Sequence, residues 1–232
     1  MANNFDKNWT TVNNNYPLND KEVERYISVK PSSNQLALVD KPFYTFMHFG
    51  MNTATDREWG AGVEKATDFT IKSINAKQWV ETAKSAGATG VILTCKHHDG
   101  FCLWPSEYTS FCVKNSSYKG DIVKEVSDEC HKQGMDFGVY LSPWDMHDER
   151  YGTDAYNDYF CNQLTELLTN YGEIFEVWFD GAKGSNAKKF EYDWQRYYDL
   201  IRKLQPKANI AICGPDIRWV GNEGGKSRKS EY

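Results

Sequence analysis

Five short apolar segments alternate with longer amphipathic ones along this chain, and no other feature constrains its fold as strongly. The apolar segments are rich in β-branched and aromatic residues, which is typical of strands buried on both faces. They span residues 43–50, 89–95, 137–142, 173–180 and 208–213. Strands that alternate with helices predict an α/β fold in which right-handed crossovers join the strands of a parallel sheet.

The amphipathic segments carry the start and stop residues of helices. Asn75 and Asp121 precede two of them as N-caps, and Gly87, Gly134 and Gly172 stand where helices end. The expected apolar faces consist of Trp79, Val80, Ala83 and Ala86; of Ile122, Val123, Val126 and Cys130; of Tyr156, Phe160, Leu164, Leu167 and Leu168; and of Trp194, Tyr197, Tyr198, Ile201 and Leu204. One further helix is expected around residues 20–26, within an Asn-rich N-terminal arm of residues 1–40.

A doubly wound sheet and a (β/α)8 barrel both fit this alternation. No Gly-rich phosphate-binding turn follows any strand, and polar or aromatic residues gather just past the strand ends, so the barrel is favoured. A complete barrel has eight βα units and typically takes about 250 residues. We therefore expect residues 41–232 to form a TIM-barrel-like domain truncated to about five or six βα units.

Composition excludes several classes of protein. The net charge of −5, with both signs interspersed, provides no basic stripe for nucleic acid. No apolar run is long enough to span a membrane, and the polar first twenty residues do not form a signal peptide, which leaves a bacterial cytoplasmic and a secreted or periplasmic location both open. The six cysteines lack CxxC and metal-ligand spacings, so we expect buried free thiols rather than a disulfide framework.

Residues able to carry chemistry follow every expected strand. Because the carboxyl ends of parallel strands meet at one edge of a sheet, we expect these side chains to converge there. They are His48, then His97, His98 and Asp99, then Trp144 and Asp145, then Trp178 and Asp180, and finally Arg218 and Glu223.

Two of these residues are carboxylates in positions that suit glycosidase chemistry. Asp180 ends an apolar strand and precedes Gly181, while Glu223 lies in a Gly-rich stretch past the next strand. In a retaining glycosidase, one carboxylate attacks the anomeric carbon while the other acts as acid and then base, about 5–5.5 Å away. Taken separately, Asp180 also fits a turn or helix-cap residue, and Glu223 fits an ordinary loop residue.

The adjacent residues His97 and His98 leave three roles open. Neighbours in a regular strand point to opposite faces, so both reach one site only if the strand has already ended. They suit hydrogen bonding to substrate hydroxyls, a structural role, or metal binding, although no H-x-H or H-x-x-x-H spacing is present. Glu58 and Trp59 offer a hydroxyl acceptor beside a stacking ring, or else belong to a surface loop.

Six sequence blocks together resemble the α-L-fucosidases of glycoside hydrolase family 29. The likeness extends from about Pro31 to the last residue, and it is closest to the subgroup that acts on α-1,3/1,4-linked branching fucose. The blocks are Phe46–Thr53, Arg57–Gly60, Val91–Trp104, Gly138–Asp145, Val177–Gly181 and Gly214–Gly224.

The resemblance implies a retaining exo-glycosidase on a (β/α)8-like catalytic domain, without a metal or other cofactor. Its nucleophile falls on Asp180, and its acid/base falls on Glu223, with Glu231 as a second candidate. The expected partner is a fucosylated oligosaccharide or glycoconjugate. The positions that bind fucose fall on His48, Glu58, Trp59, His97, His98 and Trp178, with Arg218 and Tyr140 less directly matched.

The family's closing barrel segment and the β-sandwich that usually follows it are absent from the sequence. Open sheet edges and exposed apolar surface predict self-association and weak or absent activity. Two alternatives to an exo-acting fucosidase therefore stay open. One is a fucose-binding protein without turnover, and the other is a metal-dependent barrel hydrolase that uses His97 and His98.

Overall fold

The computed structural model describes residues 19–41, 43–185 and 187–219. The chain divides into two compact units, Met1–Ser32 and Ser33–Tyr232. The first contains helix α1 (Asp20–Ile27), which confirms the helix expected around residues 20–26. Asn19 caps this helix: its Oδ1 accepts from the Glu22 amide at 3.0 Å, and its own amide donates to Glu22 Oε2 at 2.9 Å.

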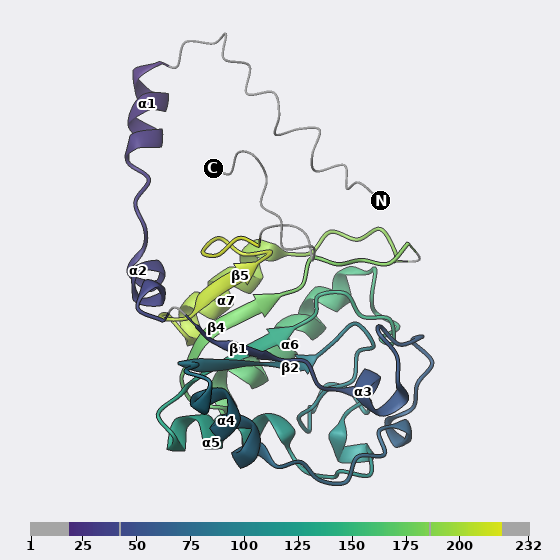
Figure 1. Cartoon of the computed structure of the whole chain (residues 1–232). Helices are drawn as coiled ribbons and strands as arrows, with labels where there is room; N and C mark the ends of the chain where they lie inside the picture. Colours follow the sequence, from purple (N-terminus) through teal and green to yellow (C-terminus); the bar gives the residue numbers. More distant parts are fainter. Residues whose placement is uncertain (1–18, 42, 186, 220–232) are drawn as a thin grey trace. The chain divides into compact units, whose positions relative to one another are not determined.

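The second unit is built on a parallel sheet whose strands lie in chain order (Figure 1). The strands are β1 (Thr45–Met47), β2 (Gly90–Lys96), β3 (Asp136–Leu141), β4 (Ile174–Phe179) and β5 (Asn209–Ile212). A doubly wound sheet reverses its strand order at a switch point, whereas this order advances in one direction throughout. The fold is therefore α/β with barrel-like winding over five strands, as the sequence predicts.

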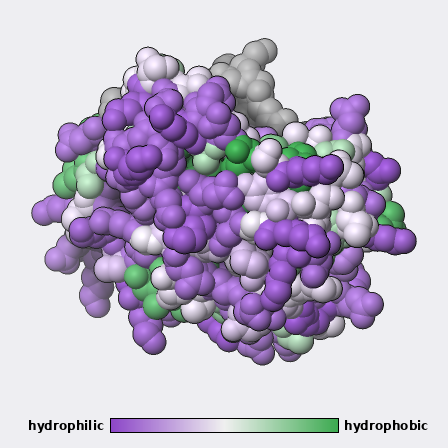
Figure 2. Space-filling model, turned by 90° about the horizontal axis from the view of Figure 1, so that it is seen from below, coloured by the Kyte–Doolittle hydropathy of each residue, from purple (hydrophilic) through white to green (hydrophobic). Residues whose placement is uncertain are grey.

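Four long helices cover the four amphipathic segments expected from the sequence. They are α4 (Ala76–Ser85), α5 (Ile122–Lys132), α6 (Asp154–Asn170) and α7 (Trp194–Leu204). The predicted N-caps are confirmed, since Asn75 Oδ1 accepts from the Gln78 amide at 3.0 Å and Asp121 Oδ1 from the Lys124 amide at 2.9 Å. The apolar faces of these helices pack with one face of the sheet into the main core. The view from below in Figure 2 shows a mostly hydrophilic surface with scattered hydrophobic residues.

The other face of the sheet carries a smaller apolar cluster of Ile92, Tyr140 and Phe175. Gly138 makes room for it, because a Cβ at this position would lie 2.9 Å from Phe175 Cε1 and 3.0 Å from Ile92 Cγ1. The register between β3 and β4 shifts between Phe137 and Val139, which is the kind of irregularity that re-aims a side chain. This inner face is thus filled by side chains next to the site described below.

Several elements were not predicted from the sequence. Helix α2 (Ser33–Val39) lies against β5, where Asn34 Nδ2 donates to the Pro206 carbonyl at 2.8 Å and Asn209 Nδ2 donates to the Asn34 carbonyl at 3.2 Å. The expected arm of residues 1–40 therefore divides, because residues from Ser33 onward belong to the sheet-containing unit. Helix α3 (Met51–Thr55) and the 3-10 helices Ala66–Asp68 and Val113–Asn115 are also unpredicted.

All six cysteines are free thiols and five are buried, which confirms the expectation from their spacing. Within the described ranges, no helix combines the length and apolar character that crossing a bilayer requires.

Candidate functional site

The carboxyl ends of β1 to β4 open into a pocket of about 620 Å³. Eight residues singled out from the sequence line it together, as expected for side chains that follow parallel strands. They are His48, Glu58, Trp59, His97, His98, Tyr140, Trp178 and Asp180.

Asp180 is the first residue after β4, and two donors hold its carboxylate in place. The Tyr140 hydroxyl donates to Oδ2 at 2.8 Å, and the Ala182 amide donates to Oδ1 at 2.7 Å. The contact with the Ala182 amide is typical of an Asp in a turn. A turn role therefore accounts for Oδ1, whereas Oδ2 is held by the Tyr140 hydroxyl. With 23% of the side chain exposed, the carboxylate remains open to the pocket.

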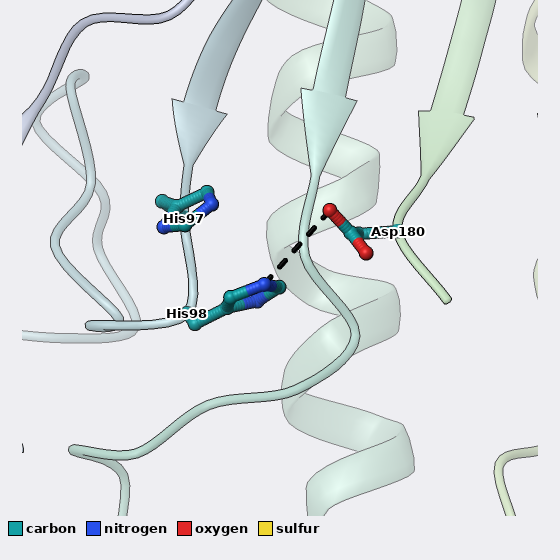
Figure 3. A group of neighbouring side chains, drawn as sticks. All are labelled: His97, His98 and Asp180. Carbon is teal, nitrogen blue, oxygen red and sulfur yellow. Dashed lines mark ion pairs between the residues drawn. The ribbon is translucent and has the colours of Figure 1, made fainter. Parts of the chain in front are cut away.

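The His97–His98 pair reaches one pocket because β2 ends at Lys96, after a register shift between Thr94 and Lys96. The two rings lie with their centroids 4.1 Å apart. His98 Nε2 faces Asp180 Oδ2 at 3.9 Å, which is too long for a hydrogen bond (Figure 3).

Both histidines are neutral at neutral pH. Burial lowers the pKa of His97 to about 2, with further lowering by the positive forms of His98 and His48. Burial also lowers the pKa of His98 to about 4, although Asp180 opposes the shift. A neutral imidazole offers the pocket one N–H donor or one lone pair, rather than a positive charge.

One group of side chains in the described residues has the spacing of a metal site. His97, His98 and Asp180 offer ligand atoms that all lie within 4.8 Å of one another (Figure 3). Two neutral imidazoles and a carboxylate form a donor set that zinc accepts. Whether all three residues offer a lone pair to a cation depends on the hydrogen bonds that the two rings form.

Two further carboxylates near the pocket have structural partners. Asp99 accepts from Asn52 Nδ2 at 3.1 Å and from the Phe101 amide at 2.8 Å, and burial raises its pKa to about 7. Asp145 forms a buried ion pair with Lys96 at 3.0 Å. Gly100, at φ +87°, packs on this pair, because a Cβ there would lie 2.5 Å from Asp145 Oδ1.

Aromatic rings build one wall of the pocket. Trp59 is 40% exposed and meets the rings of His98 and Trp144 edge to face, at centroid distances of 5.6 and 5.5 Å. Trp178 packs in the same manner against Phe46 at 5.2 Å. Exposed aromatic faces beside hydrogen-bonding groups suit a ligand with one apolar face and several hydroxyls.

The structure does not bring every predicted residue to this pocket. Arg218 is exposed and does not line it. Glu223 and Glu231 lie outside the described residues.

Several lining residues were missed by the sequence analysis. Phe46, Asn52 and Trp219 belong to the blocks that resemble the family, but their residue types alone carry no signal of a site. Asn52 reaches the pocket because only residues 48–50 separate the end of β1 from α3, and so short a helix has no periodic pattern that would predict it.

A family model described as alpha-L-fucosidase matches residues 42–226. The chain is 51% identical over 200 residues to alpha-L-fucosidase 1 of Arabidopsis thaliana, covering 84% of this chain and 40% of that protein. The chain thus spans less than half the length of this relative.

Solved structures agree in fold. A glycoside hydrolase 29 family member from an unknown rumen bacterium has a TM-score of 0.81 at 48% identity, over 84% of this chain and 38% of that one. A Ruminococcus gnavus family 29 fucosidase in complex with fucose has a TM-score of 0.80 at 36% identity, over 88% and 48%. Since the family model covers most of the sequence and the fold agrees, the chain belongs to the α-L-fucosidases of glycoside hydrolase family 29.

Proposed function

We propose that this chain hydrolyses terminal α-L-fucose from glycans with retention of configuration, and that Asp180 is its nucleophile. The observation that carries the proposal is the Asp180 carboxylate, which is held by two donors yet open to a pocket lined by neutral histidines and aromatic rings. The R. gnavus relative that was solved with fucose supports the same sugar here.

The proposed reaction has two steps. An Asp180 oxygen attacks the anomeric carbon and forms a covalent glycosyl-enzyme, while an acid/base residue protonates the departing glycosidic oxygen. The same residue then removes a proton from water, which attacks the anomeric carbon and releases Asp180. The acid/base role is proposed for Glu223, with Glu231 as the alternative, on the resemblance of their surrounding sequence to the family.

Release of 4-nitrophenol from its α-L-fucoside tests the nucleophile. Asp180→Asn removes the attacking charge, so we expect kcat/KM to fall roughly a thousandfold or more. Glu58→Gln is the matched control, because Glu58 is the other carboxylate among the described residues of the pocket. We expect Glu58→Gln to change chiefly KM. A larger loss of kcat in Glu58→Gln than in Asp180→Asn would reject the assignment.

The stereochemistry and the acid/base residue require separate measurements. Proton NMR of the first product formed must show α-L-fucose if the mechanism retains configuration. For the acid/base, azide can replace water as the second nucleophile without needing a base. Rescue of Glu223→Ala by azide, without rescue of Glu231→Ala, would support Glu223, and the opposite pattern would assign Glu231.

The linkage is proposed to be α-1,3 or α-1,4, as in the subgroup that the sequence blocks most resemble. Comparing Lewis-type trisaccharides with 2′-fucosyllactose tests this preference, and faster hydrolysis of the α-1,2-linked sugar would reject it. If no fucoside is hydrolysed but calorimetry detects L-fucose binding, the chain is a binding protein without turnover. Activity that is lost with a chelator would instead support the metal-dependent alternative.

We also propose that the chain self-associates through its β1 edge. In the described sheet, β1 pairs only with β2, and both Phe46 within β1 and Phe43 just before it are exposed, at 40% and 45%. Exposed strand edges flanked by apolar side chains promote pairing with another chain.

A further inference from the structure

Each of the two adjacent histidines in the pocket has one ring nitrogen committed to a buried polar partner. His97 Nδ1 lies 3.2 Å from Asn52 Nδ2, and His98 Nδ1 lies 2.7 Å from Ser142 Oγ. Asn52 and Ser142 are 6% and 0% exposed, so water does not compete freely for these contacts. The protons at the two contacts therefore determine what each ring presents to the pocket.

The proton between His98 and Ser142 belongs to the histidine. Ser142 Oγ also lies 2.7 Å from the Trp144 carbonyl, which can only accept. A hydroxyl has one proton, and Ser142 uses it for that carbonyl. Its oxygen therefore accepts from His98 Nδ1–H, and a neutral His98 has no proton on Nε2.

The proton between His97 and Asn52 belongs to the asparagine. The same amide nitrogen also lies 3.1 Å from Asp99 Oδ2, which accepts from it while Asp99 is ionised, above its pKa of about 7. This contact orients the amide with its NH2 group toward both neighbours. His97 Nδ1 therefore accepts, and a neutral His97 carries its proton on Nε2.

Both rings line the pocket, and His98 Nε2 lies 3.9 Å from Asp180 Oδ2, beyond hydrogen-bond distance. Neither Nε2 atom has a hydrogen-bond partner in the part of the chain that the structure describes. Neither is among the polar atoms there that are both buried and without a partner, so both are accessible. The pocket is therefore lined by an N–H group of His97 and by a nitrogen lone pair of His98.

We propose that His97 and His98 are held in opposite neutral tautomers, with Asn52 and Ser142 as their positioning residues. This inference rests on the proposed function and specifies how the pocket recognises its sugar. A hydroxyl beside His97 accepts a hydrogen bond, whereas a hydroxyl beside His98 donates one. The arrangement also leaves only two of the three lone pairs that the His97, His98 and Asp180 group would offer a cation.

Long-range proton–nitrogen NMR of the uniformly 15N-labelled chain tests the tautomers directly, without requiring activity. The chain has five histidines, so His→Gln substitutions assign each ring. We expect the protonated nitrogen to be Nε2 in His97 and Nδ1 in His98. Finding the same tautomer in both rings, or a proton on His98 Nε2, would overturn the proposal.

The substitution Ser142→Ala tests the positioning role. It removes the acceptor of His98 Nδ1–H, so we expect His98 to shift toward the Nε2–H tautomer and L-fucose affinity to fall about tenfold, as for a lost hydrogen bond. Ser127→Ala is the matched control: this serine is also fully buried, but its hydroxyl donates to the Lys124 carbonyl on α5. If both variants leave the His98 tautomer unchanged, Ser142 does not set it.

Monodeoxy and monofluoro derivatives of L-fucose test what the two rings recognise, because fluorine accepts a hydrogen bond weakly but cannot donate one. At the hydroxyl beside His98, we expect the fluoro and deoxy sugars to bind equally poorly. At the hydroxyl beside His97, we expect the fluoro sugar to bind better than the deoxy sugar. Opposite tautomers without any L-fucose binding would reject the proposed function alone, while identical tautomers with fucose binding would reject this inference alone.

Discussion

The Tyr140 hydroxyl is the only described side chain that donates to the Asp180 carboxylate. It fixes the direction in which the attacking oxygen points, so its removal costs orientation more than binding. We predict that Tyr140→Phe lowers kcat about tenfold to a hundredfold with little change in KM, from the loss of one hydrogen bond to a charged group. Steady-state kinetics on the 4-nitrophenyl fucoside measure this division.

Tyr118→Phe is the control, since its hydroxyl donates to Glu125 at 2.6 Å in an exposed contact on α5. We expect this variant to have wild-type kinetics. A rise in KM with unchanged kcat in Tyr140→Phe would show instead that the hydroxyl acts on the substrate.

At single positions, the sequence predicts the site in part. Asp180 and His97 follow strong strand signals, so their place at the sheet edge was predictable. Asn52 and Ser142 were not predictable as site residues, because their importance arises from partners 45 and 44 positions away. The roles assigned to the predicted residues remain predictions.

The regular elements were largely predictable, because buried strands and capped amphipathic helices are encoded locally. The first strand is shorter than predicted: it was expected over residues 43–50, but β1 covers only Thr45–Met47. Helix α2 was missed because its position depends on contacts with β5, such as that between Asn34 and Pro206, rather than on a periodic pattern.

The short edge strand β1 is the element through which we predict self-association. Phe43→Lys places a charge beside this edge, where pairing would bury an aromatic ring. Losing a buried aromatic side chain costs about 1.5–3 kcal/mol, so we expect association to weaken about tenfold to a hundredfold. Sedimentation velocity over a range of concentrations should shift toward the 26.7 kDa monomer.

Val63→Lys provides the matched control for this variant. Val63 is also an exposed apolar residue, at 78%, but it lies between α3 and the 3-10 helix Ala66–Asp68, whereas Phe43 lies next to β1 in the chain. Equal association of the two variants would exclude the β1 edge, and a wild-type chain that stays monomeric at high concentration would exclude self-association altogether.

For the whole molecule, the clearest link between pH and stability is Glu176 on β4. The residue is fully buried, and neither carboxylate oxygen has a hydrogen bond of good geometry within the described residues. Burial raises its pKa from 4.5 to about 7, although the nearby Tyr44 hydroxyl opposes the shift. The folded chain therefore binds this proton more tightly than the unfolded chain, and the contribution of Glu176 to stability falls as the pH rises from about 4.5 to about 7.

We predict that Glu176→Gln removes this loss. The variant should resemble the wild type near pH 4.5 and be more stable above pH 7, by up to about 3 kcal/mol for a shift of this size. Because the pKa values of His97 and His98 are lowered in the folded chain, stability also decreases as the pH falls below their unfolded pKa of 6.5. This effect is the same in the wild type and the variant, so it cancels in the difference between them. Chemical denaturation at several pH values gives that difference. Glu173→Gln, an exposed residue just before the same strand, should show none. A Glu176→Gln difference that does not vary with pH would mean that Glu176 is already charged in the folded chain throughout this pH range.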